Sequence, residues 1–583
     1  MSATPDRLET LEARVASLSG ELSRLRDRLD ALEGRAASSG AASGDAGAAP
    51  GATPGAAAEA PAATAPGGTS LVALGGRGFL IVGGAYLFRA LTEAGTLPAP
   101  LGVAAGLAYA AGWAVVAGRA GKEDRAAGTF YGLLSLLLGL PLVWEAATRL
   151  SALPPAAAAA GLAALGALVF AVAWRRDLGG LAWAATVGTV GTAFGLLVGT
   201  RRVELFAWLL IALGAAVLWA TYGRRWHGLR WPAAIGADLA ILVLVVLAGR
   251  EGGPAEAYAD LSPARAAVAA LALFVVYVGS FAVRTLVRQR SVVLFEAVQA
   301  PAALLVGFGG AVELAGAAGT GTAALGVAAL VLAAGAYGVA FAFLERQAEG
   351  ARNFLFYTSL ALVLALSGGA LLAGGALPVV WTAIGLVAVA AGTRFRRVSL
   401  CAHAAVYLWS AAFASGLVGP AVRAFAGRTA GAEDPVGRAA LLVVGAALAA
   451  LAARLVSART GAGPLRASVA PFAIGLLFLT GSSWVATAAL ARLLPGSPDA
   501  AAAARTAIAA ALAVLFAALR ARGGPNEAGW LAWTALGLTT LRAVLVELPA
   551  GRPAALFATF VLVGGALVLV ARLLRQRAVP ASG

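Results

Sequence analysis

Residues 71–576 form a succession of apolar segments, each long enough to cross a lipid bilayer as a helix. A spanning helix needs about 20 mostly apolar residues, because every backbone amide and carbonyl must be satisfied within the helix itself. Of the 583 residues, 60% are hydrophobic and 12% are charged, and the mean hydropathy is +0.84. Soluble globular domains do not have this composition. The sequence therefore predicts an all-α polytopic protein, a transmembrane helix bundle of about 18 spans built from hairpins.

The expected spans are separated by short loops, and proline stands at or near several of their starts, where its missing N–H has least effect. We expect the spans to begin near Leu71, Leu101, Ala127, Pro154, Leu178, Val203, Trp231, Ala266, Ser291, Thr322, Phe354, Leu377, Val398, Ala439, Val469, Ala504, Trp530 and Pro553.

Basic residues divide the loops into two sets. One set of alternate loops carries about twice as many basic residues as the other, and it includes Lys122, Arg224, Arg284 and Arg454. Basic loops are retained on the cytoplasmic side of a membrane. We therefore expect a multi-pass protein of the cytoplasmic membrane with both termini in the cytoplasm. A basic turn recurs at a roughly regular interval, which favours a repeat of helical hairpins.

The N-terminal segment, residues 1–35, has a heptad pattern. Leucine and valine fill the a and d positions over residues 8–32, which predicts a cytoplasmic coiled coil through which the chain forms a homo-oligomer. A single amphipathic helix packed on its own membrane domain is the alternative. Residues 36–70 are rich in Ala, Gly and Pro and predict a flexible linker, and residues 577–583 predict a cytoplasmic tail.

Composition and motifs exclude several kinds of chemistry. The net charge of +16 is a topological signal in this context, so we expect the lipid bilayer as partner and no nucleic acid. Cys401 is the only cysteine, and His227 and His403 are the only histidines, which excludes a disulfide and a zinc cage of the His/Cys type within one chain. Because nucleotide-binding and hydrolase motifs are missing, we expect no cofactor and no metal. The charged N-terminus does not predict a cleavable signal peptide.

Ionisable groups within the spans are the candidate functional residues, because a charge in the bilayer is costly. Asp238 lies about seven residues into an apolar stretch, roughly 10 Å deep at 1.5 Å per residue. It is expected to bind a cation or relay a proton, or else to be a neutral or arginine-paired structural carboxylate. Glu296 and Gln299 share a helix face and are expected to line a polar cavity, unless Glu296 lies at the interface.

The remaining candidates are two ion pairs and a histidine. Arg89 and Glu93, four residues apart, can pair near the outer end of the first span, and Arg542 with Glu547 near the outer end of the seventeenth. Both are also compatible with interfacial pairs that extend toward water. His403 lies on an alanine-rich span and is either functional or a hydrogen-bonded core residue. Glu145 follows Trp144 near the outer surface and is interpreted as an interfacial anchor.

Both ends of the membrane region carry a resemblance. The stretch GGRGFLIVGGAYLFRALTEAGTLPAPLGVAAGL follows a heptad segment and an Ala/Pro linker. Its distinctive residues are Gly75, Gly76, Arg77, Gly83 and Arg89. The closing stretch TLRAVLVELPAGRPAALFATFVLVGGALVLVARLLRQR contains a basic and an acidic residue before a glycine-containing span. This arrangement resembles the bacterial family of multispanning membrane proteins called domain of unknown function 2339. The resemblance implies a fold and a membrane location, and no reaction.

Two classes of function fit these observations. The favoured one is a non-enzymatic, transporter-like or cell-envelope component that self-associates through its coiled coil. The alternative is a membrane enzyme acting on lipid-linked substrates, as multispanning glycosyltransferases do, although such enzymes usually carry an acidic pair in an early outer loop and the first outer loop here offers only Glu93. A passive scaffold is the third possibility.

Overall fold

The computed structural model describes Gly20, Ser23 and residues 68–224, 226–250, 252–342, 351–395, 397–425, 437–458, 468–493, 498–550 and 553–575. Residues 1–73 and 74–583 are two separate units. The expected coiled coil at residues 8–32 lies outside the described residues except for Gly20 and Ser23, which are helical. Most of the expected linker and the expected tail also lie outside them.

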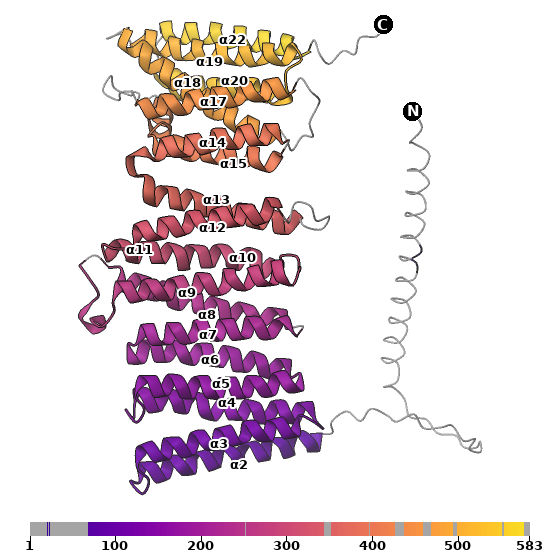
Figure 1. Ribbon diagram of the computed structural model, residues 1–583, viewed down its shortest axis with the longest axis vertical. Helices are drawn as coiled ribbons and strands as arrows, with labels where there is room; N and C mark the ends of the chain where they lie inside the picture. The colour runs from indigo at the N-terminus through magenta and orange to yellow at the C-terminus, as the bar shows by residue number, and fades with distance from the viewer. Residues whose placement is uncertain are drawn as a thin grey trace, which may run out of the picture. The chain divides into compact units, whose positions relative to one another are not determined.

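The first half of the described membrane region consists of α-helices joined mostly by short turns, with a longer connection between Ala248 and Pro263 (Figure 1). They are α2 (Gly68–Glu93), α3 (Ala99–Ala120), α4 (Arg125–Thr148), α5 (Pro155–Arg176), α6 (Gly179–Thr200), α7 (Val203–Tyr222), α8 (Arg230–Ala248), α9 (Pro263–Ala282), α10 (Leu294–Ala303) and α11 (Gly310–Ala317). The π-helix η3 (Val283–Val287) extends α9, and the π-helix η4 (Leu304–Gly309) joins α10 to α11.

The second half follows the same plan. Its helices are α12 (Thr322–Ala342), α13 (Ala351–Ala373), α14 (Leu377–Arg394), α15 (Val398–Ala414), α16 (Val418–Phe425), α17 (Arg438–Ala458), α18 (Val469–Leu493), α19 (Pro498–Ala521), α20 (Asn526–Arg542), α21 (Leu548–Ala550) and α22 (Pro553–Arg575). A third π-helix, η8 (Ala543–Glu547), continues α20. The sequence did not predict the short helix α16 or the π-helices.

The all-α class is confirmed, since no strand occurs among the residues that the structure describes. By length and composition, 14 described helical segments are able to cross a membrane. The range Arg352–Arg394 is one of the 14, although the 3-10 turn Gly374–Ala376 divides it into α13 and α14. The span expected from Val398 is the shorter apolar helix Val398–Ala414.

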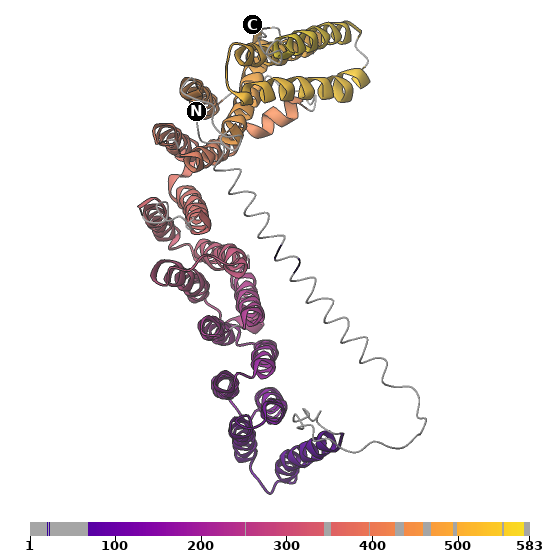
Figure 2. The same cartoon turned by 90° about the vertical axis from the view of Figure 1, so that its right-hand side faces the viewer.

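Within residues 74–583, neighbouring helices pack side by side in chain order. Extensive contacts join α3 to α4, α5 to α6, α7 to α8, α12 to α13 and α14 to α15, which are helical hairpins. From α3 to α9, each helix also contacts the one after next, so that consecutive helices alternate between two rows (Figure 2). The largest apolar core joins residues from α3 to α11 and includes Phe206, Leu244, Leu273 and Phe281.

Many large apolar side chains face outward. Phe79 is 83% exposed, Leu294 76% and Phe557 72%. A soluble monomer rarely exposes contiguous apolar patches of more than a few hundred Å², whereas lipid tails cover such a surface without cost. The outward apolar surface and the helix lengths together identify a multi-pass membrane protein.

Candidate functional site

Asp238 in the middle of α8 and Gln299 in α10 form the best-defined polar contact within the helix stack. Gln299 Nε2 donates to both carboxylate oxygens of Asp238, each at 2.9 Å. Gln299 is buried and Asp238 is half-buried. Within the described part of the chain, Asp238 forms no ion pair, so its partner is a neutral amide and not an arginine.

A buried tyrosine adds an unused hydroxyl beside this pair. Tyr277 on α9 is 1% exposed, lies within electrostatic range of Asp238, and its Oη has no hydrogen-bond partner. Gly214 on α7 leaves room for that hydroxyl, because a Cβ at position 214 would overlap it. Helices α8 and α10 therefore bring a carboxylate and an amide into contact inside the stack, and α9 places an unpartnered hydroxyl within electrostatic range of them.

Glu296, one turn before Gln299, has a different role. Arg284 Nη1 donates to Glu296 Oε1 at 2.7 Å and to Oε2 at 2.6 Å, and the Val293 amide donates to Oε2 at 3.1 Å. The Glu296 side chain is fully buried and that of Arg284 is 15% exposed. Glu296 and Gln299 lie on the same face of α10, as predicted. Glu296 is also part of a buried ion pair, and it does not line any of the four pockets described among the resolved helices.

A further arginine, Arg230, lies near this pair, although its place in a basic loop predicts only a charge facing the cytoplasm. Arg230 is 5% exposed and donates to Thr221 Oγ1 at 2.8 Å and to the Thr221 carbonyl at 3.1 Å. The guanidinium carbons of Arg230 and Arg284 lie 4.9 and 5.6 Å from the centre of the Tyr222 ring. Such cation–π contacts stabilise an arginine at the end of a span. No pattern in the sequence distinguishes an arginine that turns inward from one in water.

Two π-helices lie next to the polar residues. Arg284 belongs to η3, and η4 begins five residues after Gln299. Pro301 lacks the N–H that would continue the helical ladder of α10, which favours an irregular turn after it. A Cβ at Gly307 in η4 would lie 2.8 Å from the Ala270 carbonyl oxygen, so η4 and α9 are in backbone contact. Such π-helical turns occur frequently at functional sites.

His403 lies apart from Asp238 and Glu296. Its Nδ1 is 3.1 Å from Tyr337 Oη of α12, and the residue is 7% exposed. The helix that carries it, α15, packs on α14, α17 and α18, whereas α8 packs on α6, α7, α9 and α11. The structure thus brings Asp238 and Gln299 together and does not bring His403 to them.

Near the C-terminal end of α2, Arg89 forms ion pairs with two carboxylates. Its Nε is 2.9 Å from Glu93 Oε1, and its Nη2 is 3.1 Å from Glu145 Oε1 of α4. The three side chains line a pocket of about 190 Å³ between α2, α3 and α4. The interpretation of Glu145 as a simple anchor missed this contact, because Glu145 is 56 residues from Arg89 in sequence.

Near the C-terminal end, Arg542 and Glu547 are buried together. Arg542 Nη1 lies 2.9 Å from Glu547 Oε1, and Thr506 and Thr559 also donate to that carboxylate. A further ion pair that sequence reasoning missed joins Arg454 of α17 to Glu527 of α20 at 2.8 Å. Within the described ranges, no cluster of three or more His, Cys, Asp or Glu side chains is arranged to hold a metal ion.

Comparisons with known proteins give no relative for this chain: no protein-family model, no curated protein and no solved structure matches it.

Proposed function

We propose that this chain is a non-enzymatic, transporter-like membrane protein in which Asp238 takes up and releases a proton. The observation that carries the proposal is the pairing of Asp238 with Gln299 inside the helix stack. A carboxylate within a span is expensive unless it is protonated or paired with a cation. Since its described partner is a neutral amide, Asp238 is able to change its protonation state without breaking an ion pair.

The surroundings favour a proton over a metal cation. Hard cations take six or more oxygen ligands, whereas the groups beside Asp238 are the Gln299 amide, which donates, and the single Tyr277 hydroxyl. These surroundings suit a carboxyl that alternates between charged and neutral forms. The Gln299 amide stabilises the anion, and protonation of the carboxyl separates it from no cation among the described residues.

The test is proton flux through the full-length protein in liposomes that contain a pH-sensitive dye. With an imposed pH gradient and a potassium diffusion potential, the wild-type protein is expected to move protons faster than empty liposomes. Asp238→Asn keeps the size of the side chain and one acceptor oxygen for Gln299 but cannot release a proton, and it is expected to reduce the flux to the empty-liposome rate.

The matched control is Asp260→Asn, the same change at a residue whose side chain is 78% exposed. It should leave the flux unchanged. The thermal unfolding midpoint of each variant distinguishes loss of the proton-binding group from loss of fold. Equal fluxes for Asp238→Asn and wild-type protein, or a wild-type flux no faster than empty liposomes, would contradict the proposal.

The wider organisation belongs to the same proposal. We infer about 18 crossings with both termini in the cytoplasm, self-association through residues 8–32, and membership of the domain of unknown function 2339 family. The 14 candidate spans and the shorter helix Val398–Ala414 support a count in this range. The turn Gly374–Ala376 divides the range Arg352–Arg394 into α13 and α14, which supports counting this range as two crossings.

One contact favours the alternative of an enzyme acting on a lipid-linked substrate. Such an enzyme needs carboxylates at the outer surface, and Glu93 and Glu145 lie on either side of Arg89 at the same pocket. The discriminating experiment incubates the full-length protein with a polyprenyl-phosphate sugar and measures sugar release. Release that disappears in Glu145→Gln and persists in Asp238→Asn would favour the enzyme.

A further inference from the structure

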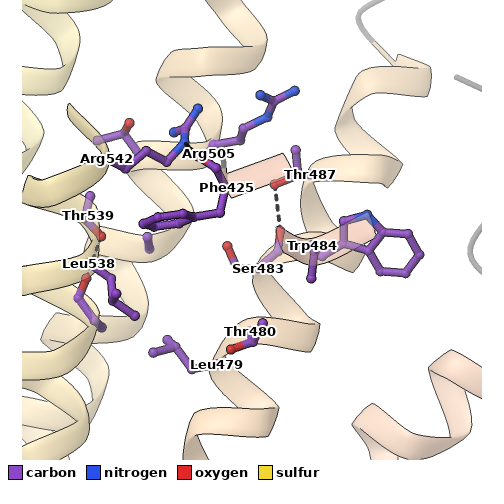
Figure 3. Close-up of a pocket in the computed structure, with 14 residues that line it drawn as sticks. Phe425, Leu479, Thr480, Ser483, Trp484, Thr487, Arg505, Leu538, Thr539 and Arg542 are labelled. Atoms are coloured by element: carbon purple, nitrogen blue, oxygen red, sulfur yellow. Dashed lines mark hydrogen bonds between the residues drawn. The ribbon is translucent and has the colours of Figure 1, made fainter. Parts of the chain in front are cut away.

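A second pocket, which the proton proposal does not use, lies between α16, α18, α19 and α20 (Figure 3). Its volume is about 110 Å³. A cavity needs only about 10–15 Å³ on this measure to hold one water molecule, so the pocket admits a small chemical group. Phe425, Leu479 and Leu538 form apolar walls, and Arg505 and Arg542 supply its charges.

The two arginines are not equally paired. Arg542 donates to Glu547 at 2.9 Å and to the Phe425 carbonyl at 3.2 Å. Glu547 also accepts hydrogen bonds from Thr506 and Thr559, so both of its carboxylate oxygens already have donors. Arg505 has no hydrogen bond or ion pair with any described residue, and its Nε is buried without a partner. The site therefore holds one positive charge more than its described residues neutralise.

Such an arrangement is costly unless an anion completes it. Arg505 is half-buried, and its buried Nε loses hydration without a compensating hydrogen bond. Both guanidinium groups lie at the same end of the pocket, and Leu479 and Thr480 lie at the other end (Figure 3). Planar guanidinium groups bind phosphate and carboxylate oxygens through two parallel hydrogen bonds. The pocket thus combines a cationic end with an uncharged one.

We propose that this pocket binds a phosphate group, and that its source is the headgroup of an anionic phospholipid. A phosphodiester carries one negative charge, which matches the one positive charge in excess. Arg505 is the eighth residue of α19 (Pro498–Ala521) and so lies in the N-terminal third of this helix, toward the end that would meet the headgroup phosphates. The apolar walls suit the start of an acyl chain. Free inorganic phosphate is the other source of the same chemistry.

The experiment titrates the full-length protein in a non-ionic detergent with phosphatidylglycerol, and separately with inorganic phosphate. Bound lipid is counted by native mass spectrometry, and phosphate is tested as a competitor and for its effect on the unfolding midpoint. Arg505→Gln removes the unpaired charge, and Arg505→Lys keeps the charge but loses the planar fork. Arg492→Gln removes an exposed arginine that does not line the pocket and is the matched control.

The wild-type protein is expected to retain phosphatidylglycerol, and Arg505→Gln to bind it about ten-fold more weakly, as the loss of a charge-assisted hydrogen bond predicts. Arg505→Lys should give an intermediate loss, which keeps the test valid if Arg505→Gln unfolds, and Arg492→Gln should bind as wild type does. Binding of inorganic phosphate alone would support the phosphate site but overturn the lipid as its source. Wild-type affinity of Arg505→Gln for both probes, or an equal loss in Arg492→Gln, would overturn the site.

Discussion

In the ion pair of Arg284 and Glu296, the two side chains differ in burial, so replacing one is expected to cost more stability than replacing the other. Glu296 is fully buried, whereas Arg284 is 15% exposed and lies over the Tyr222 ring. Without its partner, Arg284 retains some access to water and a cation–π contact. Glu296 would retain only the Val293 amide. The two halves of the pair are therefore not equivalent.

Arg284→Gln is expected to destabilise the protein by roughly 3–5 kcal/mol, because it leaves an uncompensated buried carboxylate. Glu296→Gln should cost less, and the double variant less than the sum of the two. The free energies are compared by denaturant unfolding in one detergent. An equal loss of unfolding free energy in the two single variants would show that the difference in burial between Arg284 and Glu296 has no effect on stability.

The sequence identified ionisable residues within the spans but not the partners that the structure gives them. Asp238 was found from its depth in an apolar run. Its partner Gln299 is 61 residues away, and only the register between α8 and α10 brings the two together. Arg284 and Arg454 were interpreted as loop charges, because an argument from loop composition treats all arginines alike. Tyr277 was missed because an apolar run contains no signal that its hydroxyl lacks a partner.

At the scale of elements, the helix positions were predictable and their irregularities were not. An apolar run ended by arginine, glycine or proline predicts where a helix begins and ends. A π-helix depends instead on one missing or displaced backbone hydrogen bond and on what packs against it, as Pro301 and the contact of η4 with α9 illustrate.

Gly307→Ala in η4 is expected to destabilise the protein by about 1–3 kcal/mol, because the added Cβ would lie 2.8 Å from the Ala270 carbonyl oxygen and 2.9 Å from the Phe274 amide. The matched control is Gly309→Ala in the same π-helix, whose Cβ would meet only the Leu304 carbonyl at 3.8 Å. Thermal unfolding in detergent measures both. A larger effect at Gly309 than at Gly307 would contradict the close contact.

For the whole molecule, the number and direction of the crossings follow from which side each turn faces. The positive loops predict that the turn Gly374–Ala376 lies outside the cell and that Lys122 lies inside. Both positions are exposed in the structure.

In a Cys401→Ala background, Gly375→Cys is expected to react with a membrane-impermeant maleimide on intact cells. Lys122→Cys is expected to react only after permeabilisation. Labelling of Gly375→Cys only after permeabilisation would mean that α13 and α14 do not cross the membrane as two separate spans in the proposed direction.

The packing of each helix on its neighbours in the chain has a consequence for biosynthesis. Contacts between helices join residues of modest separation, such as 54 for Arg77 and Tyr131 and 73 for Arg454 and Glu527. The bond from Arg542 to Phe425 spans 117 residues. Low contact order lets folding proceed locally, and chains fold from the N-terminus during synthesis. Each newly synthesised hairpin therefore packs on helices that are already in the membrane, and we expect the membrane domain to assemble one hairpin at a time during translation.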